Sequence, residues 1–209
     1  MTTRRDLLKA AAVAPLVFTP IAPADAMRAA EHAMRALDDQ AAGSAYAPQW
    51  FHADEWKQVR VLVDLIIPKD ARSGSATDAG VPEFMDFICK DYAPSYHWMR
   101  EGLRWIDGFA FTTHHKNFVK CTPAERRALL DQIAWPRKAT KELAQGVAHF
   151  NRLRDFTASG FYSSKMGVDD LQYIGNQAIP EWPGCPQPAL DKLGVTYDVM
   201  KSRVPVQGE

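Results

Sequence analysis

Apolar residues recur at the spacing of an α-helix through most of the chain beyond residue 53. The first clear run covers residues 55–67, where the apolar positions 56, 59, 63 and 66 lie three or four residues apart and line one helix face. Asp54 is the expected N-cap of this helix, and Pro68 ends it. The pattern therefore predicts a buried helix just after residue 53.

The same periodicity predicts further helices along the chain. Pro82 is expected at the first position of the next helix, and Thr122 with Glu125 forms a capping box before another. The predicted helices span about 55–67, 82 onward, 95–114, 123–134, 139–158 with Gly160 beyond its end, and 188–193 closed by Gly194. Gly102 and Gly108 suggest a close helix crossing. No useful β-alternation occurs, so the sequence predicts an all-α fold, a compact bundle of five to six helices.

The N-terminus has the order of an export signal. Arg4 and Arg5 precede two leucines and a lysine, an apolar stretch runs to residue 22, and small residues follow up to Ala26. Paired arginines in this setting resemble the twin-arginine signal, which exports folded proteins. Three prolines at 15, 20 and 23 argue against the alternative, an N-terminal helix of the domain. We expect cleavage after Ala26 and a periplasmic mature protein.

These segments suggest three regions. Residues 1–26 are the twin-arginine signal peptide, residues 27–52 are an alanine-rich lead segment expected to pack weakly, and residues 53–209 form the helical domain. Its last third has an irregular, aromatic and proline-rich character.

Composition and charge exclude several classes of function. The 209 residues carry 25 Lys and Arg against 25 Asp and Glu, which leaves no basic surface for nucleic acid or an anionic membrane. No run of 18 apolar residues exists to span a bilayer. Three cysteines are too few for a four-thiolate metal centre, and no Cys-x-x-Cys-His for covalent haem is present. We expect no metal or cofactor site in this chain and no nucleic-acid partner.

No catalytic motif emerges from the reactive residues. The six histidines have no metal-ligand spacing, and neither Ser163-Ser164-Lys165 nor the pair of His115 with Cys121 has an orienting group nearby in sequence. No glycine-rich dinucleotide or phosphate loop occurs. Four acidic residues around a Ser-Gly loop, Asp70, Asp78, Glu83 and Asp86, are interpreted as solvated charges.

The segment from Gly160 to Pro188 is the most informative. It is rich in aromatics and prolines but has little helical period with which to bury them. It is interpreted either as a loop folded back over the core or as an apolar surface that a partner covers. The candidate interface residues are Phe161, Tyr162, Tyr173, Trp182 and Cys185. In an exported protein Cys185, between Gly184 and Pro186, invites an intermolecular disulfide.

Several of these strings together resemble a known family. Leu65-Ile66-Ile67-Pro68-Lys69-Asp70, Ala79-Gly80-Val81-Pro82-Glu83-Phe84-Met85-Asp86, and residues 150–157 leading to 160–164 are similar to the hallmark of the gluconate 2-dehydrogenase subunit 3 family. The resemblance covers about residues 53–195. The strings around Tyr173 and around Trp182 to Cys185 look closest to small subunits of glucoside 3-dehydrogenases.

The resemblance implies a role outside catalysis. Members are small helical subunits of periplasmic, membrane-associated sugar and alcohol dehydrogenases. Their large subunit resembles glucose–methanol–choline oxidoreductases and holds the FAD, and a multihaem cytochrome c takes the electrons. The leader of the small subunit is thought to export the large one. Two alternatives stay open, a stand-alone enzyme and a stand-alone periplasmic binding or scaffold protein.

Overall fold

Every regular element in the described part of the chain is helical. The computed structural model describes residues 21–173 and 184–197. The α-helices are α2 (Pro23–Ala41), α3 (Ala53–Ile66), α4 (Val81–Asp91), α5 (His97–His114), α6 (Pro123–Ala134), α7 (Ala144–Ser163), α8 (Lys165–Asp170) and α9 (Gln187–Leu193), and the 3-10 turns are η1 (Ala93–Tyr96), η2 (Phe118–Lys120) and η3 (Lys141–Leu143). The all-α prediction is confirmed. The described ranges hold more helices than the five or six expected, because α2 and α8 were not among them.

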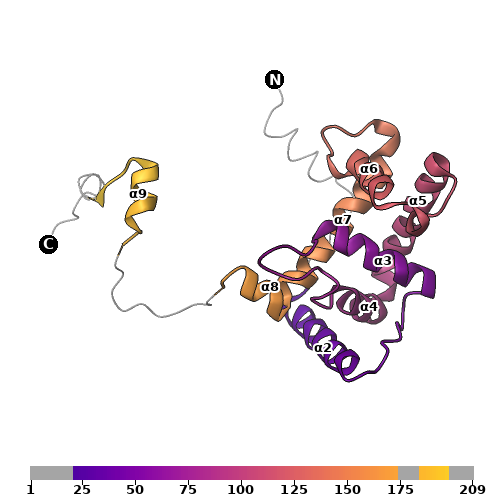
Figure 1. Ribbon diagram of the computed structural model, residues 1–209, viewed down its shortest axis with the longest axis horizontal. Coiled ribbons are helices and arrows are strands. Elements are labelled where there is room, and N and C mark those ends of the chain that lie inside the picture. The colour runs from indigo at the N-terminus through magenta and orange to yellow at the C-terminus, as the bar shows by residue number, and fades with distance from the viewer. Residues whose placement is uncertain (1–20, 174–183, 198–209) are drawn as a thin grey trace. The chain divides into compact units, whose positions relative to one another are not determined.

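Helix α7 is the centre of the first unit of the fold. The chain divides into two units, residues 1–173 and 174–209. In the first unit α7 contacts α2, α3, α4, α5, α6 and α8 (Figure 1). Its buried residues include Phe150, Leu153, Phe156 and Phe161, which lie three, three and five positions apart along the helix. A single apolar face of this length gives the surrounding helices a common surface to pack on.

Helix α2 packs firmly against α4, so the expectation that residues 27–52 pack weakly is wrong. Ala29, Ala33 and Ala36 of α2 are buried. A Cβ added at Gly80, which has φ +77°, would lie 3.1 Å from Leu37 Cδ1 and 3.2 Å from Ala33 Cβ. Small side chains thus bring α2 close to the turn before α4 (Figure 1), where a left-handed backbone requires glycine.

The helix starts follow their capping residues. At α6 the predicted capping box is present, because Glu125 N donates to Thr122 Oγ1 at 3.3 Å and Thr122 N donates to Glu125 Oε2 at 2.7 Å. Helix α3 begins at Ala53, two residues earlier than expected, so His52 takes the N-cap position predicted for Asp54. There, His52 N donates to Glu55 Oε2 at 2.9 Å.

Glycines inside the helices have different roles. A Cβ on Gly102 of α5 would lie 3.2 Å from the His149 side chain on α7, which confirms the predicted close crossing. Gly108 has nothing within 4 Å of its added Cβ, so the same prediction is wrong there. Gly160 does not follow the end of α7 but lies within it, and a Cβ added there would lie 3.0 Å from Phe84 Cδ1. Its missing side chain makes room for a neighbouring aromatic ring.

The second unit is described only over residues 184–197. Helix α9 occupies the predicted range, and Gly194 closes it with φ +63°. The expectation of one domain over residues 53–209 differs from the division after Tyr173. None of the described helices is long and apolar enough to cross a membrane.

We expect Gly167→Ala to lower the free energy of unfolding by about 1–3 kcal/mol, because the new Cβ has no room. It would lie 2.1 Å from the backbone oxygen of Phe161, which cannot move without distorting α7. Gly108→Ala is the matched control and should stabilise the helix by about 0.5–1 kcal/mol. Urea unfolding of both variants measures the difference, and equal midpoints would contradict the packing described here.

Candidate functional site

The carboxylate of Asp86 joins α4 to the chain between α2 and α3. Asp86 is 1% exposed, and its Oδ2 accepts hydrogen bonds from Tyr46 Oη at 2.9 Å and Gln49 N at 2.7 Å. Its Oδ1 accepts from Trp50 N at 2.9 Å and Phe51 N at 3.1 Å. Four donors aimed at one carboxylate compensate for the loss of its hydration. This contact fixes the path of residues 46–51.

Glu83, one helical turn earlier, is also buried. Its Oε1 accepts from Gln40 Nε2 at 3.2 Å and lies 3.7 Å from Arg60 Nη1. Its Oε2 has no hydrogen-bond partner among the described residues. Burial raises the pKa of Glu83 above its ordinary value, although the bond from Gln40 and the charge of Arg60 act against this. Glu83 thus ties α4 to both α2 and α3.

The interpretation of Glu83 and Asp86 as solvated charges is therefore wrong. Both lie on α4, where Val81, Phe84, Met85 and Ile88 are also buried, so the helix has almost no polar face toward solvent over these turns. This apolar surround was the sequence signal that marked both carboxylates as interior. Asp70 and Asp78 instead hold the loop before α4, where Asp70 Oδ1 accepts from Ser73 N at 2.9 Å and Asp78 Oδ2 accepts from Ser75 N at 2.9 Å.

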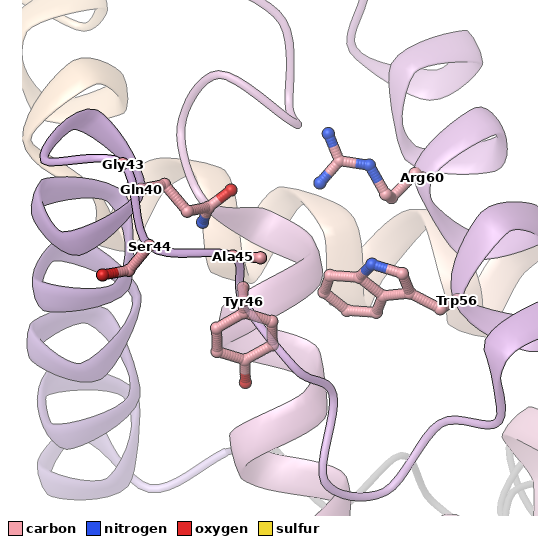
Figure 2. Close-up of a pocket in the computed structure, with 7 residues that line it drawn as sticks. All are labelled: Gln40, Gly43, Ser44, Ala45, Tyr46, Trp56 and Arg60. Carbon is pink, nitrogen blue, oxygen red and sulfur yellow. The ribbon is translucent and has the colours of Figure 1, made fainter.

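A pocket opens beside these carboxylates, between the end of α2 and α3 (Figure 2). It has a volume of about 470 Å³ and is lined by Gln40, Gly43, Ser44, Ala45, Tyr46, Trp56 and Arg60. The rings of Tyr46 and Trp56 stack with centroids 5.4 Å apart, and Arg60 lies 5.9 Å from the Trp56 ring. The Arg60 guanidinium points toward the Gln40 amide across the opening (Figure 2).

The pocket offers binding groups rather than an activated nucleophile. The Tyr46 hydroxyl already donates to Asp86, and burial followed by the Asp86 charge raises the pKa of Tyr46. A tyrosine in this state stays protonated at neutral pH and does not act as a base. What remains is a cation, an amide and two aromatic rings, which suit a small polar group or a side chain of another protein.

The other reactive residues have structural roles. Ser164 Oγ accepts from Gly167 N at 3.1 Å and donates to the Phe161 carbonyl at 2.7 Å, so it caps α8. Cys121 is buried, and burial raises the pKa of its thiol. His149 is buried with neither ring nitrogen hydrogen-bonded to a described residue, and burial lowers its pKa. Across residues 21–173 and 184–197, no group of three His, Cys, Asp or Glu residues is arranged to hold a metal ion.

The structure separates the five predicted interface residues. Phe161 is 1% exposed and packs in the core of its own unit, so it is not available to a partner and that expectation is wrong. Its place in the last turn of α7, a helix predicted to end earlier, explains the error. Tyr162 and Tyr173 are exposed, and Cys185 is exposed in the second unit. Trp182 lies outside the described residues, as do Arg4 and Arg5 of the export signal.

A further exposed residue, which the sequence pattern did not indicate, lies between the two tyrosines along the chain. Leu171 follows α8 and is 57% exposed, against 43% for Tyr162 and 63% for Tyr173. We call Tyr162, Leu171 and Tyr173 the α8 surface. Three large apolar side chains exposed within twelve positions of one another in sequence are a candidate contact site for another chain.

Comparison with known proteins settles the family. A family model described as Gluconate 2-dehydrogenase subunit 3 matches residues 53–184, which is more than half of the chain. The chain belongs to the gluconate 2-dehydrogenase subunit 3 family. No curated protein matches it, and no solved structure matches it.

The match to the gluconate 2-dehydrogenase subunit 3 family begins where α3 begins and ends before α9. Both buried carboxylates and the α8 surface lie within it. Helix α2 and residues 46–51 lie outside, although Asp86 and Glu83 hold them in place. The family name describes a subunit of a dehydrogenase, so the chain is a component of a multisubunit enzyme.

We expect Asp86→Asn to lower the free energy of unfolding by about 2–4 kcal/mol. The NH2 group of the new amide would replace one acceptor oxygen and would face groups that are themselves hydrogen-bond donors. Asp54→Asn is the matched control, since its side chain is 99% exposed, and it should change stability by less than about 0.5 kcal/mol. Denaturant unfolding of the two variants is the measurement. If Asp86→Asn unfolds at the midpoint of the unaltered chain, Asp86 does not hold residues 46–51.

Proposed function

We propose that this chain is the non-catalytic accessory subunit of an FAD-dependent dehydrogenase that oxidises sugars or alcohols. Membership of the gluconate 2-dehydrogenase subunit 3 family is the observation that carries the proposal. The catalytic subunit, of the glucose–methanol–choline type, holds the FAD, and a multihaem cytochrome c receives the electrons. The substrate class is that of gluconate 2-dehydrogenase or of glucoside 3-dehydrogenase.

The chain also exports its partner in this proposal. Arg4 and Arg5 begin a leader of the twin-arginine type, a route that accepts folded cargo. A flavoprotein without its own leader then crosses the inner membrane only when it is already bound to this chain. The complex works in the periplasm and is attached to the inner membrane through its other subunits. Stabilising the catalytic subunit and exporting it are thus two results of one contact.

The α8 surface is the proposed contact. Aromatic side chains are enriched in the buried centres of protein interfaces, where they bring a large apolar area with few rotatable bonds. Tyr162, Leu171 and Tyr173 fit this description. Trp182 and Cys185 follow in sequence and are proposed contacts as well. For Cys185 we propose a disulfide bond to the partner. The oxidising periplasm permits such a bond.

The export role is tested by the double variant Arg4→Lys with Arg5→Lys, which keeps the charge of the leader and removes the arginine pair. When it is co-expressed with the flavoprotein subunit, we expect dehydrogenase activity in the periplasm to fall to background, while activity remains in the cytoplasm. Lys9→Arg is the control and should export normally. Unchanged periplasmic activity in the double variant would exclude export by this route.

We expect Tyr173→Ala to weaken association with the flavoprotein about tenfold, because a central aromatic anchor contributes more than 1 kcal/mol to binding. Its stability should not change, since Tyr173 is 63% exposed. The control is Phe111→Ala on α5, which removes a ring of similar exposure, 58%, outside the α8 surface. Titration calorimetry or co-purification measures the affinity. Equal losses in both variants would place the contact elsewhere, and a chain that sediments alone as a stable monomer with no flavoprotein bound would favour a free scaffold protein.

A further inference from the structure

The predicted leader cleavage site lies inside a folded helix. The bond expected to be cut joins Ala26 to Met27, and α2 begins at Pro23. Asp25 N and Ala26 N both donate to the Ala22 carbonyl, at 2.9 and 3.0 Å. The residues that mark the cleavage site are thus the first turn of α2, with Pro23 in the early position that suits proline.

This first turn is packed on the rest of the unit. Ile21 and Ala26 are partly buried against the core, and Ala29 is fully buried one turn later. The turn does not stand free of the domain as a leader junction normally does. Any peptidase that cuts here must first separate these residues from the core.

Polar contacts hold the turn from both sides. Arg28 Nη2 donates to Asp25 Oδ1 at 2.7 Å, and Arg28 Nη1 lies 3.7 Å from Asp91 Oδ2 at the end of α4. The Tyr92 side chain also interacts with the Asp25 carboxylate, and this interaction raises the pKa of Tyr92. The turn is therefore tied to residues more than 60 positions away in the chain.

Peptidases hydrolyse chain that is extended or locally opened, and a native segment is cut in proportion to the fraction of time it is open. Hydrolysis at this bond adds one water, leaving a carboxylate on Ala26 and an amine on Met27. A helical, packed turn reduces the open fraction. Ala22-Pro23-Ala24 is a second small-residue pattern that could direct cleavage. Its cleavable bond, Ala24–Asp25, lies in the same helical turn and is protected in the same way.

We propose that the folded first turn of α2 protects the Ala26–Met27 bond from leader peptidase, so that the exported chain keeps its leader until this turn opens. The inference rests on the proposed function, because it requires the leader to be an export signal.

The test uses the full-length chain, purified from the cytoplasm and incubated with detergent-solubilised leader peptidase. Mass spectrometry follows the appearance of the product that begins at Met27. Tyr92→Ala removes a support of the turn without altering any residue near the cut, and we expect it to speed cleavage about two- to fivefold. Arg28→Ala should act in the same direction.

Two controls separate opening of the turn from a general loss of stability. Phe111→Ala removes an exposed ring elsewhere in the unit, and Arg35→Ala removes an arginine of α2 that donates to the Glu31 carbonyl at 3.3 Å within the same helix. Both should be cut at the rate of the unaltered chain. If Tyr92→Ala is cut no faster than Phe111→Ala, or if the product begins before residue 21, the inference is wrong.

Failure of the inference and failure of the proposed function give different results. In cells, a periplasmic chain that begins at Met27 as soon as it is exported leaves the export role intact and overturns the protection of the leader. A chain that stays in the cytoplasm overturns the export role. The purified-chain comparison decides the inference in that case as well, because it does not depend on transport.

Discussion

The buried carboxylate of Asp86 is the contact on which the arrangement of the first three described helices depends. A carboxylate taken out of water is costly unless hydrogen bonds replace its hydration. Here all four replacing donors come from residues 46–51, a segment without regular structure that has its own backbone N–H groups to satisfy. The carboxylate of Asp86 gains the donors that it needs, and the backbone N–H groups gain an acceptor. Because this segment joins α2 to α3, its attachment to α4 positions both neighbours, and all three of these helices also contact α7.

The buried polar side chains of this unit link its helices to one another. Glu83 links α4 to α2 and α3 through Gln40 and Arg60, and Ser164 turns the chain from α7 into α8. His149 fills space against Gly102 as an imidazole whose pKa is lowered by burial. Groups held in this way are not poised to exchange protons with a substrate. Such use of titratable residues supports the proposal of an accessory subunit.

The sequence predicted the parts of this fold that local signals determine. Local signals mark several helix ends: Thr122 with Glu125 and Gly194 do so where expected, and α4 begins at Val81, one residue before the start predicted at Pro82. Tertiary packing determines the rest. The alanine stripe of α2 has little hydrophobic signal of its own, yet small residues are what a close helix contact requires. Phe161 has the composition of an interface residue, but only the longer course of α7 shows that its ring faces the core.

In the proposed export role, the small residues in 22–29 would serve both leader cleavage and helix packing. Leader peptidases recognise small residues near the cut, and small residues also let α2 approach α4, as Ala29 does at full burial. A stretch such as Ala22-Pro23-Ala24-Asp25-Ala26 therefore cannot be assigned to leader or to fold from residue types alone. The distinction lies in whether the stretch is extended or helical when the peptidase meets it. Contacts from Arg28 and Tyr92 on Asp25 favour the helix. In the proposed export role, removal of the leader would therefore depend on how often this turn opens as well as on the residues around the cut.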